Sequence, residues 1–321
     1  MPETELITRT VPLEACNARL DVTLAAMFPE FSRARLVQWL QEGHILVDGN
    51  VCKPRFKLHG GECVSFQRPV SIMADTLPEA QDIALDIVYE DDEVLVINKP
   101  AGLVVHPGAG NPRDTLLNAL LHYAPALSEL PRGGIVHRLD KDTTGLMVVA
   151  KTLEAQTSLV RQLEARVVER RYLALVHGHV TGGGMLETGY GRHPRQRLKM
   201  AVLQGGKVAI THYRLRAHFP GCSLLDVHLK TGRTHQIRVH MSHLHHPLIG
   251  DSLYGSRRIA KLDDASLRQA LTEFPRQALH AATLAFTHPT RGDILTCEAP
   301  LPQDFASLLE LLGSTDEPDF C

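Results

Sequence analysis

From Ile83 onward, short apolar runs alternate with polar turns, and this pattern limits the possible fold more than any other feature of the sequence. Strand-sized runs recur along this part of the chain, at 87–89, 94–97, 172–176, 208–215 and 224–229. Helical spacing is confined to a few segments, at 116–121, 159–165 and 302–312. Strands and helices do not alternate regularly, and no glycine-rich nucleotide-binding motif occurs. We therefore expect an α+β fold with a mixed or antiparallel sheet flanked by helices.

The first part of the chain has a different pattern. Leu20, Leu24 and Met27 have near-helical spacing, and a second apolar helix is expected from an N-cap at Ser32 to about Leu40. The turn residues 48–50 then separate two apolar runs, which predicts a hairpin. These features indicate a small helix–helix–hairpin unit.

The expected domain boundaries follow from these changes of pattern. The small unit spans 17–68, and the polar, proline-containing stretch 69–82 is expected to be a linker. The larger domain then spans 83–312. Residues 1–16 and the acidic residues 313–321 are expected to be tails, although the first twelve or so residues also fit a short strand.

Composition narrows the classes of function. The 321 residues carry 34 Lys and Arg against 36 Asp and Glu, a net charge of −2, so any nucleic-acid site must be a local patch. The six cysteines are scattered, so we expect no metal site. No apolar run approaches the roughly 18 residues of a transmembrane helix, and the polar start lacks the features of a signal peptide. We expect a cytoplasmic protein that is not bound to a membrane.

Three segments concentrate polar residues between apolar flanks. The first, 137–140, reads His-Arg-Leu-Asp and fits either a site placed on a turn by a rigid sheet or a capped, solvated turn. In the second, Arg233, Gln236 and His240 share one face if the segment is a helix. In the third, Tyr172 follows a basic pair at a strand start, a position where tyrosine usually serves packing.

At these segments the sequence resembles the RluA-type pseudouridine synthases. The similar segments read HRLDKDTTGL, RRYLALVHG, GRTHQIRVH and, upstream, NKPAGLVVHPG. The stretch that begins RLDVTLAAMFPEF resembles an S4 RNA-binding domain, and the likeness extends from about Arg19 to Leu312. The resemblance implies a pseudouridine synthase core behind an S4-like domain. Such enzymes isomerise uridine in RNA, breaking the N1–C1′ bond and joining C5 to C1′ without a metal or a small-molecule cofactor.

The resemblance also implies roles for single residues. Asp140 matches the catalytic aspartate, and Arg233 matches the arginine that keeps this acid ionised in a closed site. Tyr172 matches the tyrosine that lies against the target uracil and helps to remove the C5 proton. Ile237 either packs on the base from the other side or is a core aliphatic. Arg138 either fills the space that the extruded base leaves or makes a structural ion pair.

RNA binding requires phosphate contacts, and two groups of basic residues are the candidates. The group in the S4-like unit comprises Arg33, Arg35, Lys53, Arg55 and Lys57. The group in a later loop comprises Arg192, His193, Arg195, Arg197 and Lys199. Each run also fits a merely solvated face. His137 and the histidines from 235 to 246 are expected to be structural or to face RNA.

The C-terminal half resembles those family members that modify large-subunit ribosomal RNA. The expected partner is therefore 23S rRNA or a precursor of the large subunit, with uridines of the helix 69 hairpin loop as targets, and the protein is expected to be a monomer. Three alternatives stay open. They are a synthase for other rRNA or tRNA uridines, an inactive RNA-binding assembly factor, and a glycoside-cleaving hydrolase. The last needs a second carboxylate, and the nearby Asp142 occupies a different motif position.

Overall fold

The computed structural model divides into two compact units, Met1–Leu77 and Pro78–Cys321, which are described separately. The residues that the structure describes are 5–29, 31, 33–68, 78–108, 110–255 and 263–313. Most of the expected linker, 69–77, and the expected tail from 314 onward lie outside these ranges, as do Ser32, the expected N-cap, and the side chain of Arg35.

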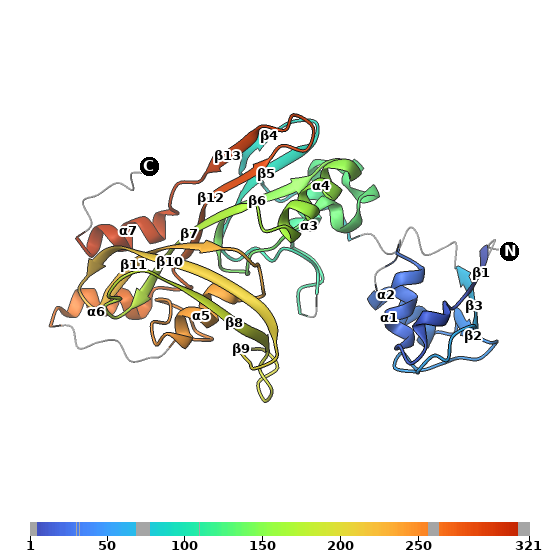
Figure 1. Ribbon diagram of the computed structural model, residues 1–321. Coiled ribbons are helices and arrows are strands. Elements are labelled where there is room, and N and C mark those ends of the chain that lie inside the picture. The colour runs from blue at the N-terminus through green and yellow to red at the C-terminus, as the bar shows by residue number, and fades with distance from the viewer. Residues whose placement is uncertain are drawn as a thin grey trace. The chain divides into compact units, whose positions relative to one another are not determined.

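The first unit packs two helices against a three-stranded antiparallel sheet (Figure 1). Its elements are β1 (Glu5–Thr10), the short 3-10 helix η1 (Leu13–Ala15), α1 (Leu20–Met27), α2 (Arg33–Gln41), β2 (Ile45–Val47) and β3 (Cys63–Arg68). Leu20 and Leu24 from α1, and Phe28 directly after it, meet Trp39 and Phe66 in a buried core. The two predicted helices are thus present at the expected positions.

Two details of this unit were left open or missed by local spacing. Residues 5–10, which fit either a tail or a short strand, form the strand β1 and pair with β3 along its whole length. The turn at Asp48 and Gly49 is present, with both residues at positive φ, but the segment after it does not form the second strand of a hairpin. β2 pairs instead with β3. In both cases the partner strand lies further along the chain, so local spacing does not reveal it.

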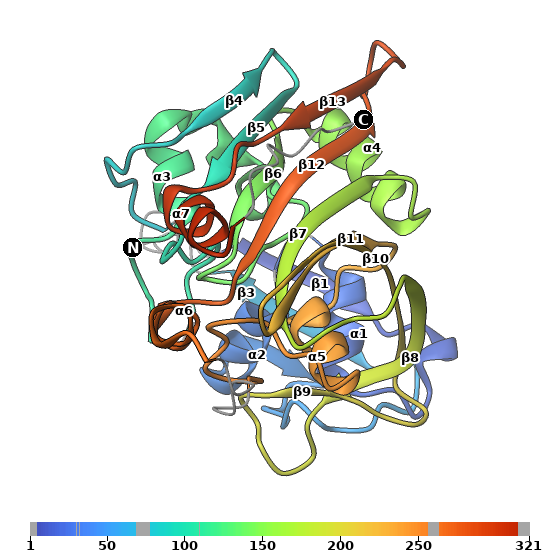
Figure 2. The same ribbon diagram turned by 90° about the vertical axis from the view of Figure 1, so that its left-hand side faces the viewer.

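The second unit is built on one ten-stranded sheet (Figures 1 and 2). Its strands are β4 (Ile87–Glu90), β5 (Val94–Lys99), β6 (Thr144–Ala150), β7 (Glu169–His177), β8 (Gly184–Arg192), β9 (Met200–Val202), β10 (Lys207–Phe219), β11 (Cys222–Leu229), β12 (Leu279–Thr287) and β13 (Ile294–Glu298). Its α-helices are α3 (Leu116–Tyr123), α4 (Leu153–Glu164), α5 (Gln236–His243), α6 (Ala265–Glu273) and α7 (Gln303–Leu311). The short 3-10 helices are η3 (Pro125–Glu129) and η4 (Pro131–Gly134).

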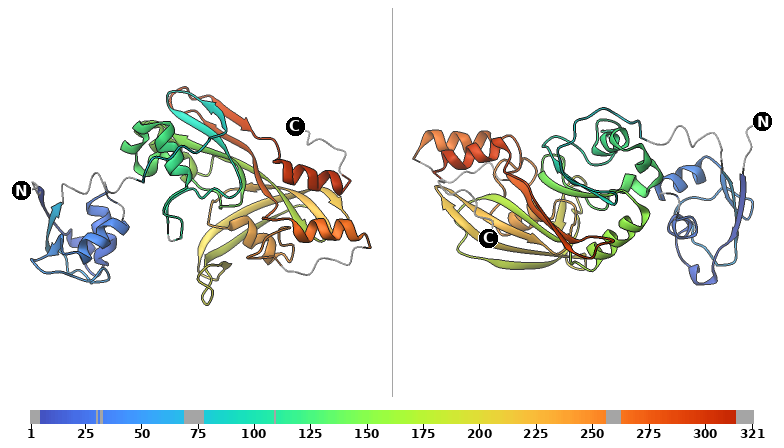
Figure 3. Two further views of the ribbon diagram at one scale, coloured as in Figure 1. Left: turned by 180° about the vertical axis from the view of Figure 1, so that it is seen from behind. Right: turned by 90° about the horizontal axis from the view of Figure 1, so that it is seen from above.

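The helices cover both faces of this sheet, and Figure 3 gives two further views of them. On β6, Met147 and Val149 pack with α3, whereas Leu146 and Val148 point to the other face and pack with α4. The same alternation on β7 and β11 puts one set of side chains against α5 and the other against α6 and α7. The predicted α+β fold, with a mixed sheet flanked by helices, is confirmed.

The sheet runs in the order β4-β5-β6-β12-β7-β11-β10-β8-β9, with β13 beside β12. Its neighbouring strands are antiparallel except for β6 and β12, which are parallel. Parallel strands begin at the same edge of a sheet. The residues just before β6 therefore lie beside those just before β12, although more than 130 positions separate Thr144 from its partner His280.

In the part of the chain that the structure describes, no helix is long and apolar enough to cross a membrane.

Three consecutive residues in the left-handed conformation precede the polar segment 137–140. Arg132, Gly133 and Gly134 have φ values of 58°, 60° and 75°. A β-carbon at Gly134 would lie 1.9 Å from the carbonyl oxygen of Ala150, so the chain passes too close to β6 for any side chain. This approach fixes where the polar segment 137–140 begins.

We predict that Gly134→Ala destabilises the second unit by about 3 kcal/mol or more, because the new methyl group meets the backbone of β6. Gly102→Ala is the matched control: Gly102 also has a positive φ, of 82°, but a β-carbon there meets no atom within 4 Å. It should lose only the about 1–2 kcal/mol of left-handed strain. Thermal unfolding followed by circular dichroism measures both, and equal losses would contradict the steric argument.

Candidate active site

The central acid of the site stands on a turn before β6. Asp140 has a side chain that is 14% exposed, and its carbonyl oxygen accepts a hydrogen bond from the amide of Thr143. Lys99 is fully buried beneath this turn and donates to the carbonyl oxygens of Lys141, at 2.8 Å, and Leu103, at 2.9 Å. Burial lowers the pKa of Lys99 to about 7 despite the nearby acids, so this lysine serves as a hydrogen-bond donor within the fold.

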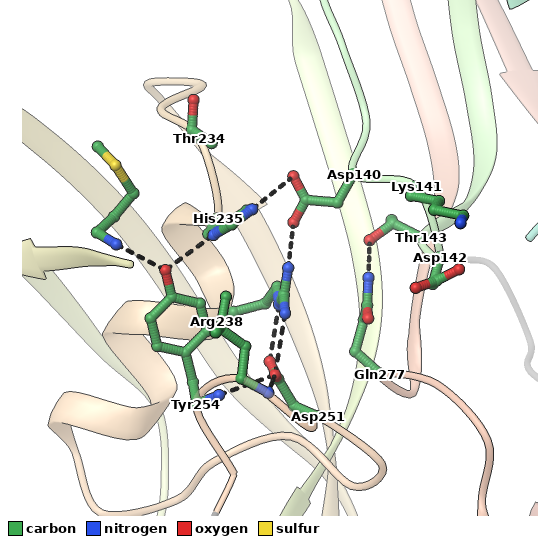
Figure 4. A network of polar contacts seen from close by, with 12 residues as sticks. Asp140, Lys141, Asp142, Thr143, Thr234, His235, Arg238, Asp251, Tyr254 and Gln277 are labelled. Carbon is green, nitrogen blue, oxygen red and sulfur yellow. Dashed lines mark hydrogen bonds and ion pairs between the residues drawn. The ribbon is translucent and has the colours of Figure 1, made fainter. Parts of the chain in front are cut away.

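The other side of the turn is bound to the segment before β12. Gln277 Nε2 donates to Thr143 Oγ1 at 3.1 Å (Figure 4). Arg276 Nη1 donates to the carbonyl oxygen of Asp142 at 3.2 Å. These contacts follow from the parallel register of β6 and β12. The turn that carries Asp140 is thus held from two directions, which restricts the position of its carboxylate.

Arg238 makes the ion pair with Asp140 (Figure 4). Its Nη1 lies 3.0 Å from Asp140 Oδ2, while its Nε and Nη2 donate to the two oxygens of Asp251 at 2.7 and 3.0 Å. The sequence assigned this pairing to Arg233, and that assignment is wrong. Arg233 is exposed, and its Nε donates to the carbonyl oxygen of Val208 at 3.4 Å.

The start of α5 explains the difference. The helix begins at Gln236, not near Arg233, because the Gln236 side chain bonds to Ile210 and Thr211 on β10 and accepts the amide of Arg233. Arg238 therefore lies in the first helical turn, 7% exposed. The position of Arg238 between the apolar Ile237 and Val239 was the one sign in the sequence that this arginine is buried. Its carboxylate partners could not be predicted, because they come from distant segments.

Charge and hydrogen bonding reinforce each other in this trio. Burial works against the charged form of Asp251, but its hydrogen bonds from Arg238 and from two backbone amides, with the guanidinium charge, lower the pKa of its carboxyl. Burial likewise opposes the charge of Arg238, yet Asp251 and Asp140 together raise the pKa of the guanidinium. Arg238 thus stays charged and presents one fixed donor to Asp140.

His235 and Tyr254 complete the polar network of Figure 4. His235 precedes α5 in a left-handed conformation, with φ of 57°, and its Nδ1 lies 2.8 Å from the Tyr254 hydroxyl. Its Nε2 faces Asp140 Oδ1 at 3.9 Å. Burial lowers the pKa of His235 even though Asp140 opposes this, so the ring is neutral at neutral pH. The sequence predicted only that His235, like the histidines that follow it, is structural or faces RNA.

A cavity of about 300 Å³ opens beside Asp140, within the size range of small-ligand sites. Tyr172, Ile237, Arg138 and Arg233, all picked out in the sequence, line it together with the acid. Tyr172 is 5% exposed, and burial, with the charge of Asp140, raises the pKa of its phenol. The phenol is therefore protonated at neutral pH. The structure thus gathers these five residues around one cavity, although it gives Arg233 a different contact.

The lining of the cavity is strongly cationic. Asp140 is the one acidic residue among the lining residues, and Arg238 is already bound to Asp251. Four further arginines contribute to the lining: Arg132, Arg138, Arg170 and Arg233. Burial, with the charges of Arg132 and Arg138, lowers the pKa of the nearby His106 to about 4. Such a cavity favours an anionic ligand.

The candidate RNA-binding residues lie on both units. In the first, Lys53 and Arg55 are exposed, Lys57 donates to the carbonyl oxygen of Asn17, and Arg33 pairs with Asp21 at 2.6 Å. In the second, the end of β8 and the loop that leads to β9 carry the other group, with Arg192, Arg195 and Arg197 exposed. Lys199 Nζ lies 5.9 Å from the centre of the Tyr254 ring, so this loop adjoins the network around Asp140.

Over the described ranges, no group of three or more His, Cys, Asp or Glu residues is placed to hold a metal ion.

Comparison with known proteins gives concordant matches. Residues 93–243 match the family model described as RNA pseudouridylate synthase, and residues 18–64 match the S4 domain. Relatives from Xylella fastidiosa and Pseudomonas aeruginosa are each 54% identical, over 94% and 96% of this chain and 91% and 96% of theirs. A relative from Escherichia coli is 50% identical over 97% of this chain and 95% of its own. All three are named ribosomal large subunit pseudouridine synthase D.

Two solved structures resemble this chain in fold. Human RNA pseudouridylate synthase domain containing 4 has a TM-score of 0.55 at 25% identity and covers 71% of this chain and 92% of its own. Human RNA pseudouridylate synthase domain containing 1 has a TM-score of 0.52 at 28% identity, over 75% of this chain and 99% of its own.

We predict that Arg238→Met lowers the free energy of unfolding at pH 7 by about 3–5 kcal/mol, because Asp251 and Asp140 lose their cation while partly or fully buried. The lowered pKa of Asp251 means that the pair stabilises the native protein above the unfolded-state pKa, and that this contribution is lost on acidification. The difference from wild type should therefore narrow as the pH falls. Urea unfolding at several pH values measures it.

Arg233→Met is the matched control, since Arg233 is exposed and has no carboxylate partner among the described residues. It should change the stability by no more than about 0.5 kcal/mol. A larger loss from Arg233→Met than from Arg238→Met would restore the assignment made from the sequence.

Proposed function

The chain belongs to the RNA pseudouridylate synthase family, and we propose that it converts uridine to pseudouridine in large-subunit ribosomal RNA, in the hairpin loop of helix 69. Membership makes it an RNA-modifying isomerase. The names of its relatives support the choice of RNA, because the alignments cover nearly the whole length of both chains. The S4 domain supports an RNA substrate independently.

One observation carries the proposed mechanism: a single carboxylate, held by Arg238, faces a cavity whose other charged groups are cations. The isomerisation requires the N1–C1′ bond to break, the uracil to turn and C5 to bond to C1′. Asp140 can add to the base, attack C1′ or remove a ribose proton, and each route needs its carboxylate to donate an electron pair. Arg238 binds Oδ2 and so orients the carboxylate while leaving Oδ1 available to substrate.

Tyr172 is proposed to lie against the uracil. Its ring is buried in the cavity wall, so it offers an aromatic face for stacking, and its phenol is protonated because burial raises its pKa. When the new C5–C1′ bond has formed, C5 must lose its proton. A neutral phenol in contact with the base can relay that proton to an acceptor such as Asp140, which lines the same cavity.

Arg138 is proposed to fill the space left by the target base. A uridine stacked in a hairpin has to be extruded before it enters a cavity of this size. Arg138 is exposed at the cavity, and no acid among the described residues pairs with it, which favours the RNA-facing role over a structural ion pair. Ile237 is 3% exposed and lines the cavity, so packing on the base and packing in the core are both part of its role.

The basic residues of both units are proposed to bind the RNA backbone. Lys53, Arg55 and the exposed arginines of the β8–β9 loop supply positive charge on a chain whose net charge is −2. Binding that depends on such local phosphate contacts weakens as the salt concentration rises. We place the protein in the cytoplasm, where large-subunit precursors are assembled, and propose that it acts as a monomer.

We predict that Asp140→Asn abolishes isomerisation while RNA binding stays within about threefold of wild type, because the amide keeps the shape of the carboxylate but lacks the negative charge that makes it a nucleophile or base. In cells that lack the protein, pseudouridines should be missing from the helix 69 loop, and only the wild-type gene should restore them. Mapping of pseudouridines in 23S rRNA checks this. Their presence without the protein would refute the proposed substrate.

We predict that Tyr172→Phe retains RNA binding and loses at least tenfold in turnover, since the ring remains for stacking but the hydroxyl that relays the C5 proton is gone. Release of tritium from C5-labelled uridine in RNA measures the proton step, and filter binding measures affinity. Wild-type tritium release from this variant would remove Tyr172 from proton transfer and leave it a stacking role.

A further inference from the structure

Arg170 is a buried arginine of the cavity wall that none of the contacts described so far uses. It lies on β7 two residues before Tyr172, so the alternation of the strand directs both side chains to the same face. Arg170 is 7% exposed and lines the cavity, as Tyr172 does. Its backbone pairs with β12 at Leu284, which fixes its position in the sheet.

The guanidinium of Arg170 has no anionic partner in the described part of the molecule. Its Nε is buried without a hydrogen-bond acceptor, and no carboxylate pairs with it. The other buried arginines are paired: Arg238 binds Asp251, and Arg276 binds Asp304 through two hydrogen bonds of 2.7 Å. An unpaired buried charge costs several kcal/mol, since it loses hydration without a compensating interaction. Burial accordingly lowers the pKa of Arg170.

Gly232 makes room for the guanidinium at the cavity wall. A β-carbon at Gly232 would lie 2.6 Å from Arg170 Nη1, so a side chain there would press on the guanidinium. Gly232 itself lines the cavity and has no positive φ, so what matters here is the missing side chain and not a special backbone conformation. Arg170 and Gly232 thus border the same cavity, where a bound ligand can meet the guanidinium.

The chemistry of the missing partner follows from these contacts. A neutral oxygen would leave most of the desolvation cost of the guanidinium uncompensated, whereas an anionic oxygen satisfies both its charge and its planar donors. Two anionic oxygens come with the target nucleotide. One is a phosphodiester oxygen, which is charged throughout. The other is a uracil carbonyl oxygen, which gains charge when the N1–C1′ bond breaks and its electron pair moves into the ring.

We propose that Arg170 is a substrate-binding residue that donates hydrogen bonds to an anionic oxygen of the target nucleotide. The inference rests on the proposed function for the RNA substrate and adds the group that receives its negative charge. In the free protein Arg170 is an unsatisfied charge, and bound substrate supplies its partner. Its place beside Tyr172 puts this donor next to the position proposed for the uracil.

The test compares Arg170→Met with Arg171→Met in the full-length protein. Arg171 is the next residue of the same strand, but it is exposed on the opposite face and pairs with Glu169. For both variants we measure the melting temperature, the dissociation constant for an RNA that wild type modifies, and the single-turnover rate of pseudouridine formation. Arg170→Met should keep or raise the melting temperature, because it removes an unpaired buried charge. It should lose at least tenfold in binding or in rate, while Arg171→Met stays within about threefold of wild type.

The two sources of the anionic oxygen give different results. A phosphodiester contact is present before the reaction, so Arg170→Met would weaken RNA binding and leave the single-turnover rate of the bound complex nearly unchanged. A contact to the uracil oxygen gains strength only as the glycosidic bond breaks, so the rate would fall at unchanged affinity. Gly232→Ala, which presses on the guanidinium without straining the backbone, should change the same parameter in the same direction.

Two outcomes would overturn the inference. In one, Arg170→Met binds and reacts like wild type. In the other, its melting temperature falls by more than about 5 °C, which would make Arg170 a structural residue of β7. These outcomes are distinct from a failure of the proposed substrate, in which the wild-type protein itself would not modify helix 69 RNA.

Discussion

The bridge that Arg238 makes between Asp251 and Asp140 is the interaction on which the site depends. It joins three segments: the turn before β6, the first turn of α5 and the loop that follows this helix. Asp251 accepts from two of the three guanidinium nitrogens and leaves Nη1 for Asp140, so the orientation of the arginine is fixed before any substrate arrives. A single free lysine charge could not be aimed in this way, because the planar fork of arginine allows two carboxylates to be bound at defined angles.

Much of the fold followed from local patterns. The strands β4, β5, β7, β10 and β11 and the helices at 20–27, 33–41 and 116–123 lie where apolar spacing predicted them, because each buries a side that its own residues define. Apolar spacing did not predict β8, β9, β12 and β13. The pairing of the outer strands of the first unit was harder to predict from local spacing. Local spacing left a tail or a short strand open at β1, since its partner β3 lies more than fifty residues further along the chain. The second strand of the predicted hairpin was wrong for the same reason.

In the site, the sequence identified some residues but not their partners. Asp140, Tyr172 and Ile237 were found from motif resemblance, and all three line one cavity. The arginine partner was misassigned because the start of α5 depends on Gln236 side-chain contacts to β10, which no local spacing encodes. The sequence did not identify Arg170 as a site residue, because it is one of two adjacent basic residues. Only the strand's alternation separates the buried Arg170 from the exposed Arg171.

The parallel pairing of β6 and β12 has a consequence for how the molecule is made. The turn that bears Asp140 is fastened by Gln277 and Arg276, and Thr144 contacts His280, so its supports are translated long after the turn itself. Domains form progressively as a nascent chain leaves the ribosome. A chain interrupted before β12 would carry the S4 domain and every motif up to α5 yet lack the clamp on its central acid. Competence for chemistry therefore arrives only with nearly the entire polypeptide.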